Sequence, residues 1–178
     1  MGHLVYDVAV SLDGYISGPD GDISAFPSTG DHVDAYFERL QHYGTTVMGR
    51  NTYEFGYAYG LKPGQRAYPH MRHVIFSAGI ALPQDSDVHV ERDPARWLSV
   101  IDTLKEETDH DIYLCGGGRF AGFLLEHERI DRLVVKLAPV IIGGGVPLFE
   151  SAARASFAAA SAHRHDSGVV TIVSEKVR

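Results

Sequence analysis

Segments rich in valine, isoleucine and tyrosine recur along the whole chain, and this recurrence constrains the fold most. They cover residues 4–10, 45–48, 73–77, 88–91, 111–115, 132–142 and 169–175. Several are apolar almost throughout instead of alternating, which is typical of strands buried on both faces of a sheet. Helices are therefore expected to cover both sides of that sheet.

Amphipathic helical patterns lie between these segments. The first has an N-cap candidate in Asp31, and its apolar stripe consists of Val33, Tyr36, Phe37 and Leu40. A second helix is predicted from Asp93-Pro94, and a short third one just after Gly118. Strands that alternate with helices over the first two thirds of the chain favour an α/β fold with a largely parallel sheet.

The last third of the chain has a different pattern. A long strand is predicted from residue 130 to 142, followed by a glycine break at 143–145, an Ala/Ser-rich segment and a closing strand. Because no full-length helix separates these parts, an antiparallel finish is expected. The chain has 178 residues without repeats or low-complexity linkers, so it is predicted to form one domain, residues 1–178.

Charge and composition exclude several classes of function. There are 16 Lys+Arg against 23 Asp+Glu, a net charge of -7 without a basic block, which disfavours nucleic acid as a partner. Cys115 is the single cysteine, and the ten histidines form no three-ligand pattern, so no metal is predicted. No apolar stretch reaches the roughly 18 residues of a membrane span and no signal-type segment is present, so we expect a cytoplasmic protein without a membrane partner.

A first glycine-bearing turn follows the segment at 45–48. Gly49 lets the backbone approach a phosphate, Arg50 supplies a cation with a planar fork, and Thr52 adds a hydroxyl. Strand ends are where open α/β sheets bind ligands, so the turn is a candidate for nucleotide phosphates. The alternative is a plain strand-to-loop turn with a solvated arginine.

A second cluster runs from Cys115 through three glycines to Arg119 and Phe120, between an apolar strand and a helix. Consecutive glycines favour backbone access, and a helix N-terminus favours an anion. A flexible connector is the alternative. A Rossmann fingerprint is rejected, because the next strand, from Asp131 to Leu137, does not end in the acidic residue that this fingerprint requires.

The order of these motifs resembles the dihydrofolate reductase-like superfamily, and more closely the branch related to the reductase domain of the riboflavin-biosynthesis deaminase/reductase. The motifs span nearly the entire chain and comprise residues 11–16 (SLDGYI), 48–52 (MGRNT), 75–77 (IFS), 113–118 (YLCGGG), Asp131 and 139–149 (PVIIGGGVPLF). The resemblance implies a three-layer fold with a mixed, mostly parallel sheet, an antiparallel C-terminal strand and helices on both faces. It also implies a homodimer, for which the apolar carboxy-terminal strands are the candidates.

The same resemblance implies NADPH as cofactor, lying across the strand ends. It assigns the adenine-side phosphates to Gly49, Arg50 and Thr52, with Arg50 a candidate for the 2′-phosphate. It assigns the adenosine side to Ser77, and the pyrophosphate to Gly116, Gly117 and Gly118, with a cis peptide between the first two glycines. The flanking Cys115, Arg119 and Phe120 are included in this turn. The nicotinamide is assigned to Ala9 and Ile16.

The catalytic group is less clearly indicated. In folate-reducing relatives an acidic side chain lies on the first helix, whereas here Val33 takes that position, which argues against dihydrofolate as the substrate. Asp34 and Asp31 are the nearest catalytic candidates, with helix capping as the alternative. Asp13 is a candidate substrate or loop residue, with a turn bonded to its own backbone as the alternative.

These observations predict an NADPH-dependent reductase that transfers hydride to a small pyrimidine- or pteridine-like compound. Examples are 5-amino-6-(5-phosphoribosylamino)uracil of riboflavin biosynthesis and an unknown relative. The alternative is a non-catalytic NADP-binding module that has lost the substrate chemistry. Binding loops are expected at residues 17–30 and 53–68, and the segment at 12–30 is expected to act as a lid.

Overall fold

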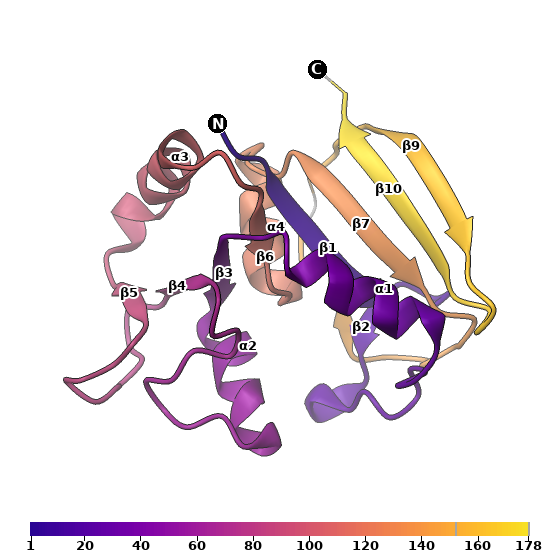
Figure 1. The fold of residues 1–178 in the computed structure, drawn as a ribbon, viewed down its shortest axis with the longest axis horizontal. Helices are drawn as coiled ribbons and strands as arrows, with labels where there is room; N and C mark the ends of the chain where they lie inside the picture. The colour runs from indigo at the N-terminus through magenta and orange to yellow at the C-terminus, as the bar shows by residue number, and fades with distance from the viewer. Residues whose placement is uncertain (152, 178) are drawn as a thin grey trace.

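The computed structural model describes residues 1–151 and 153–177. Eight strands form one sheet in the order β5-β4-β3-β6-β1-β7-β10-β9 (Figure 1). Their bounds are Leu4–Val10 (β1), Thr45–Gly49 (β3), Arg72–Phe76 (β4), His89–Glu91 (β5), Ile112–Leu114 (β6), Arg132–Leu137 (β7), Phe157–Arg164 (β9) and Val170–Lys176 (β10). Only β10 pairs antiparallel, with β7 and β9, among the described strands of this sheet. The mixed, mostly parallel sheet is therefore confirmed.

Helices cover both faces of the sheet (Figure 1). They are α1 (Asp31–Leu40), α2 (Arg50–Phe55), α3 (Trp97–Glu107) and α4 (Gly118–Glu126), with short 3-10 turns η1 (Pro19–Gly21), η2 (Gly56–Tyr59) and η3 (Pro94–Arg96). A small second sheet joins β2 (Tyr15–Ser17) to β8 (Val146–Pro147). The three-layer arrangement follows from strands that are apolar on both faces.

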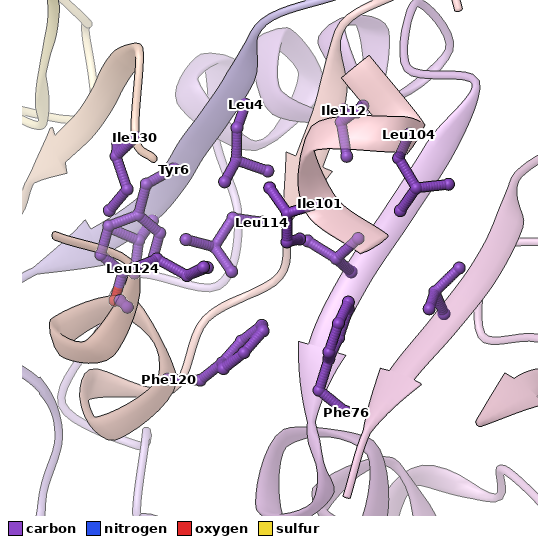
Figure 2. Close-up of a cluster of buried hydrophobic side chains, with 14 residues drawn as sticks. Leu4, Tyr6, Phe76, Ile101, Leu104, Ile112, Leu114, Phe120, Leu124 and Ile130 are labelled. Carbon is purple, nitrogen blue, oxygen red and sulfur yellow. The ribbon is translucent and has the colours of Figure 1, made fainter. Parts of the chain in front are cut away.

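The larger core cluster lies between the sheet and the helices α3 and α4 (Figure 2). The side chains that fill it come from alternating positions of the strands and from one face of each helix. They include Leu4, Tyr6, Ile112, Leu114, Ile101, Leu104, Phe120 and Leu124. On the opposite face of the sheet, Val5, Tyr113 and Val134 pack against Leu40 and Tyr43 at the end of α1.

The first helix differs in detail from its prediction. Its N-cap is Gly30, so Asp31 is the first helical residue and not the cap. Phe37, which belongs to the predicted stripe, is 57% exposed, whereas His32, which does not belong to it, is buried. The apolar stripe is therefore rotated toward His32, because this face of the helix covers a cavity as well as the core.

The C-terminal third also differs from its prediction. Strand β7 ends at Leu137, because Pro139 follows and the carbonyl of Val140 turns to accept the Leu12 N–H at 2.9 Å. The Ala/Ser-rich segment forms the edge strand β9, although alanine has low strand propensity. The backbone hydrogen bonds of its pairing with β10 stabilise this strand despite the low propensity of its residues. The antiparallel finish itself is confirmed.

Candidate active site

Two glycine-bearing turns meet at the carboxyl ends of neighbouring parallel strands. β3 and β6 are adjacent, with Val47 opposite Leu114, and the Cys115 N–H donates to the Val47 carbonyl at 3.0 Å. A side chain on Gly117 would place its Cβ 2.8 Å from Thr52 Oγ1. The turn after β3 and the turn after β6 therefore lie against each other, as the sequence predicts.

The second turn is shaped by left-handed glycines. Gly116 and Gly117 have φ angles of 62° and 86°, a region that residues with a Cβ rarely occupy. The cis peptide expected between them is wrong, since the described residues contain no cis peptide bond. The turn leads directly into α4, whose first N–H groups have no partner within the helix. A helix N-terminus behind a glycine turn is the backbone arrangement that anion sites use.

A cavity of about 410 Å³ adjoins these turns. Its walls come from the strand ends, from α1 and from the loops predicted at 17–30 and 53–68. The lining residues are Asp7, Val8, Ala9, Ile23, Phe26, Pro27, His32, Val33, Tyr36, Met48, Thr52, Tyr53, Phe55, Gly56, Leu61, Ala67, Tyr68, Tyr113, Cys115, Gly116, Lys136, Ala138 and Val169. Both predicted binding loops therefore reach the cavity, and their segments around η1 and around α2 face each other in Figure 1.

An ionic network forms one wall of the cavity. Lys136 Nζ lies 2.5 Å from Asp7 Oδ1, and Arg39 Nε donates to Asp7 Oδ2 at 2.9 Å. Tyr43 adds a longer hydrogen bond to the same oxygen at 3.4 Å. The Asp7 side chain is fully buried, so two cations and a phenol compensate its charge.

The protonation of this network follows from its surroundings. Burial raises the pKa of the Asp7 carboxyl, but the charges of Lys136 and Arg39 outweigh this effect and hold that pKa below its usual value. Burial lowers the pKa of the Lys136 ammonium, and Asp7 opposes that shift. The ammonium also lies 3.7 Å from the ring centre of Tyr36, a cation–π contact. The cavity therefore presents a positioned N–H donor.

Tyrosine hydroxyls continue the polar wall. Tyr36 and Tyr113 share a hydrogen bond of 2.8 Å, and the Tyr68 hydroxyl lies 3.5 Å from the Cys115 sulfur. Burial raises the pKa of Tyr36 and of Tyr113 above the usual phenol value. Burial likewise raises the pKa of the Cys115 thiol. These groups are therefore hydrogen-bond donors at neutral pH, and Cys115 is not an activated thiolate.

Several predicted cofactor residues line the cavity, and others do not. Ala9, Thr52, Cys115 and Gly116 line it. Ile16 packs against the larger core cluster, and Phe120 is a core residue whose ring stacks on Phe76 with centroids 5.0 Å apart. The Phe120 side chain is therefore structural. Gly118 adjoins the carbonyl of Pro147, with no room for a Cβ.

The polar residues on the adenosine side are engaged or exposed. Arg50 Nε donates to Glu54 Oε1 at 2.9 Å. Arg119, which was predicted in the pyrophosphate turn, is exposed. The Ser77 hydroxyl oxygen accepts the N–H of Ile80 at 3.1 Å, so it shapes the turn after β4. A Cβ added to Gly49 would lie 3.5 Å from the Phe120 Cβ, so the two turns are in van der Waals range of each other.

The predicted acidic candidates lie outside the cavity. The Asp31 carboxylate accepts the Asp166 N–H at 2.9 Å, a bond that holds its pKa at about 2. Asp34 is exposed on α1. Asp13 accepts the Ser11 hydroxyl at 2.6 Å and the Gly143 N–H at 2.7 Å. These hydrogen bonds give Asp31 and Asp13 structural roles in holding loops, and neither Asp31 nor Asp34 lines the cavity.

Sequence reasoning missed Asp7, Lys136 and Arg39. Asp7 and Lys136 each interrupt an otherwise apolar strand, and β1 pairs with β7 so that Ala9 lies opposite Lys136. A charged residue within a strand buried on both faces was the available signal, because such a charge needs a partner. The partner could not be found without the strand register.

The fold and the paired turns define the class of protein. The enzyme dihydrofolate reductase of Enterococcus faecalis, complexed with NADP(H), superposes with a TM-score of 0.66 at 15% identity, covering 99% of this chain and 97% of that chain. This likeness shows the dihydrofolate reductase-like fold that the sequence predicts. Residues 2–171 match the RibD C-terminal domain family, and the chain belongs to it.

Other relatives agree with this family. The protein YwjB of Bacillus subtilis (strain 168) is 31% identical over 147 residues, 80% of this chain and 79% of the relative. YyaP of the same organism is 23% identical over 179 residues, 96% and 93% of the two chains. A Shewanella sp. PV-4 protein named for riboflavin biosynthesis superposes over both full chains with a TM-score of 0.81 at 24% identity.

A longer relative shares the fold as one part of its chain. The diaminohydroxyphosphoribosylaminopyrimidine deaminase/5-amino-6-(5-phosphoribosylamino)uracil reductase of Thermotoga maritima superposes with a TM-score of 0.69 at 14% identity. The match covers 99% of this chain and 57% of that one.

Within residues 1–151 and 153–177, no group of three metal-ligating side chains gathers. No helix in this described part is long and apolar enough to span a membrane.

Proposed function

We propose that this protein is an NADPH-dependent reductase that acts on a small pyrimidine- or pteridine-like compound. The observation that carries the proposal is the meeting of the two glycine-bearing turns beside one cavity. Two fold neighbours support it. One is complexed with NADP(H), and the other is named as a reductase of a substituted uracil.

The residues of the two turns fit a dinucleotide. Gly116 and Gly117 leave room at Thr52 that a Cβ would fill, and α4, whose first N–H groups have no partner within the helix, begins at the next residue. Bound there, NADPH supplies a hydride from its nicotinamide C4. Ala9, which has a short side chain, lines the cavity and lies opposite Lys136 in the sheet.

The chain itself positions the substrate and protects it from water. Tyrosine rings and aliphatic side chains from both loops line the cavity, and they would shield a substrate bound beside Gly116 from water. Lys136 Nζ and the Tyr36 hydroxyl are donors within this wall. One of them is expected to supply the proton that completes the reduction. Asp7 then keeps Lys136 oriented.

A titration with two cofactors tests the proposal. NADPH and NADH are titrated calorimetrically into the natural protein, Arg50→Ala and Glu54→Gln. Arg50→Ala is expected to weaken NADPH binding about tenfold and to leave NADH binding unchanged, because only NADPH carries the 2′-phosphate. Glu54→Gln releases Arg50 from its salt bridge and is expected to strengthen NADPH binding. Equal affinities for NADPH and NADH in all three proteins would remove the phosphate role.

The rival proposal is an NADP-binding module without catalysis. It is favoured by Val33, which lines the cavity where folate-reducing relatives have an acid, and by the position of Asp31 and Asp34 outside it. Stopped-flow mixing of NADPH-loaded protein with uracil and pteridine compounds separates the two proposals. Substrate-dependent loss of the reduced-nicotinamide absorbance eliminates the module, whereas its absence across the panel eliminates the reductase.

A further inference from the structure

The charged groups of the cavity balance each other. Among the described residues that line it, Lys136 is the single lysine or arginine, and its ammonium is paired with Asp7. The second oxygen of that carboxylate is held by Arg39. The cavity therefore offers a directional donor without an unpaired positive charge.

The rim of the cavity is apolar on both sides. Ile23, Phe26 and Pro27 come from the loop around η1, and Phe55 and Leu61 come from the segment around α2 and η2. A ligand that extends outward from Lys136 passes between these side chains. They offer no group that would compensate a negative charge.

Two arginines that neighbour cavity-lining residues in the sequence have other partners, and Lys62, next to Leu61, is exposed and does not belong to the lining. Arg66 donates to the Asp87 carbonyl at 3.1 Å, and Arg50 pairs with Glu54. His32, which lines the cavity, bonds through Nε2 to the Pro27 carbonyl at 3.1 Å. Because a carbonyl only accepts, His32 carries its proton on Nε2, and its buried Nδ1 has no donor or acceptor partner in the described part of the chain.

We infer that the cavity takes a compact, uncharged planar ring without a phosphate group. This inference rests on the proposed reductase and names its substrate class. Tyr36, Tyr68 and Tyr113 line the cavity, and a ring carbonyl would accept a hydrogen bond from Lys136 Nζ. A phosphate held within the cavity would find no unpaired lysine or arginine among the described lining residues, which disfavours phosphorylated compounds there.

A matched pair of ligands tests this inference. The probes are 5-amino-6-(5-phosphoribosylamino)uracil and its dephosphorylated ribosyl counterpart, titrated calorimetrically with and without NADPH. The dephosphorylated compound is expected to bind at least about tenfold more tightly than the phosphorylated one. Tighter binding of the phosphorylated compound, or no binding of the dephosphorylated one, overturns the inference. A missing NADPH isotherm counts against the reductase alone, because the uracils are also measured without it.

Two variants show that the cavity decides this preference. Lys136→Met is expected to weaken binding of the dephosphorylated compound about tenfold, because the ring carbonyl of the compound loses a charged hydrogen-bond donor. Val33→Arg adds a cation to the cavity wall and is expected to strengthen binding of the phosphorylated compound about tenfold. The matched Val33→Gln is expected to leave that affinity unchanged. An unaltered preference in both Lys136→Met and Val33→Arg, each shown to be folded by its melting curve, also overturns the inference.

Discussion

Asp7 illustrates how a single buried charge organises the site. Its carboxylate accepts hydrogen bonds from Lys136 on the neighbouring strand β7, far away in the sequence, and from Arg39 on α1. The pair thereby ties α1 to the sheet while aiming Lys136 at the cavity. Sequence alone showed two charges in apolar strands, but their meeting depends on the parallel register of β1 and β7.

Removing the two partners of this network is expected to have unequal effects. Asp7→Ala leaves Lys136 and Arg39 without their counter-charge and should lower the free energy of unfolding by about 3–5 kcal/mol. Lys136→Met should cost less, because Arg39 and Tyr43 still hold Asp7. Urea unfolding of both variants measures the difference. Equal losses would mean that Arg39 does not compensate Asp7.

The glycine turn makes a second prediction at the residue scale. Gly117→Ala should reduce NADPH affinity at least about tenfold, because its Cβ meets Thr52 Oγ1 at 2.8 Å and its φ is 86°. Gly79→Ala is the matched control, since its Cβ meets nothing within 4 Å and its φ is ordinary. The two dissociation constants are compared by fluorescence titration. An unchanged affinity in Gly117→Ala would contradict the assignment of this turn to the cofactor.

At the scale of elements, the sequence predicts strands and helices that are held by strong local patterns. Helix α4 begins at Gly118, and Asp93 caps the η3 turn that opens the second helix, both as expected. β9 was not predicted, because an Ala/Ser-rich segment becomes a strand only through pairing with β10. Phe37 was wrongly predicted to be buried for a similar reason. Helical spacing defines an apolar stripe, but it does not show which side of that stripe packs against the sheet.

The segment that carries Tyr68 is held by a buried histidine. His73 Nε2 accepts the Tyr68 N–H at 3.2 Å, and Nδ1 donates to the Met71 carbonyl at 3.1 Å. Burial lowers the pKa of His73 to about 4. Protonation of Nε2 removes the acceptor that Tyr68 uses. Acid therefore loosens one wall of the cavity.

This bond makes stability depend on pH in a defined window. Because the folded protein favours the neutral ring, the contribution of His73 is complete above its ordinary pKa of 6.5 and is lost as pH falls toward 4. The loss should be about 2 kcal/mol, which thermal melting between these pH values measures. His73→Gln keeps an acceptor that does not titrate, so the melting temperature of this variant should depend less on pH over the same range. A wild-type slope identical to that of His73→Gln would refute the role of His73.

At the scale of the whole molecule, β9 is the longer of the two edge strands of the large sheet, and β5 is the other. Its residues from Ala158 to Arg164 are exposed, and β10 covers only one of its two edges. Small side chains leave such an edge open to pairing with another strand. The homodimer implied by the family resemblance is therefore expected to form along β9.

Light scattering after size-exclusion chromatography tests this assembly. The natural chain of 19.5 kDa is expected to elute with twice that mass. Ala160→Lys places a charge on the exposed edge and should give the monomer, while Gly79→Ala should leave the dimer intact. A monomeric natural protein, or a dimer that Ala160→Lys does not disturb, would refute pairing through β9.

The convergence of the two glycine turns on one dinucleotide is tested most directly by a crystal structure of the protein with NADPH. The account predicts pyrophosphate oxygens within hydrogen-bond distance of the N–H groups that begin α4, and the nicotinamide ring beside Ala9 in the cavity. Density for NADPH elsewhere on the molecule, or a pyrophosphate that leaves Gly116 and Gly117 uncovered, would contradict it.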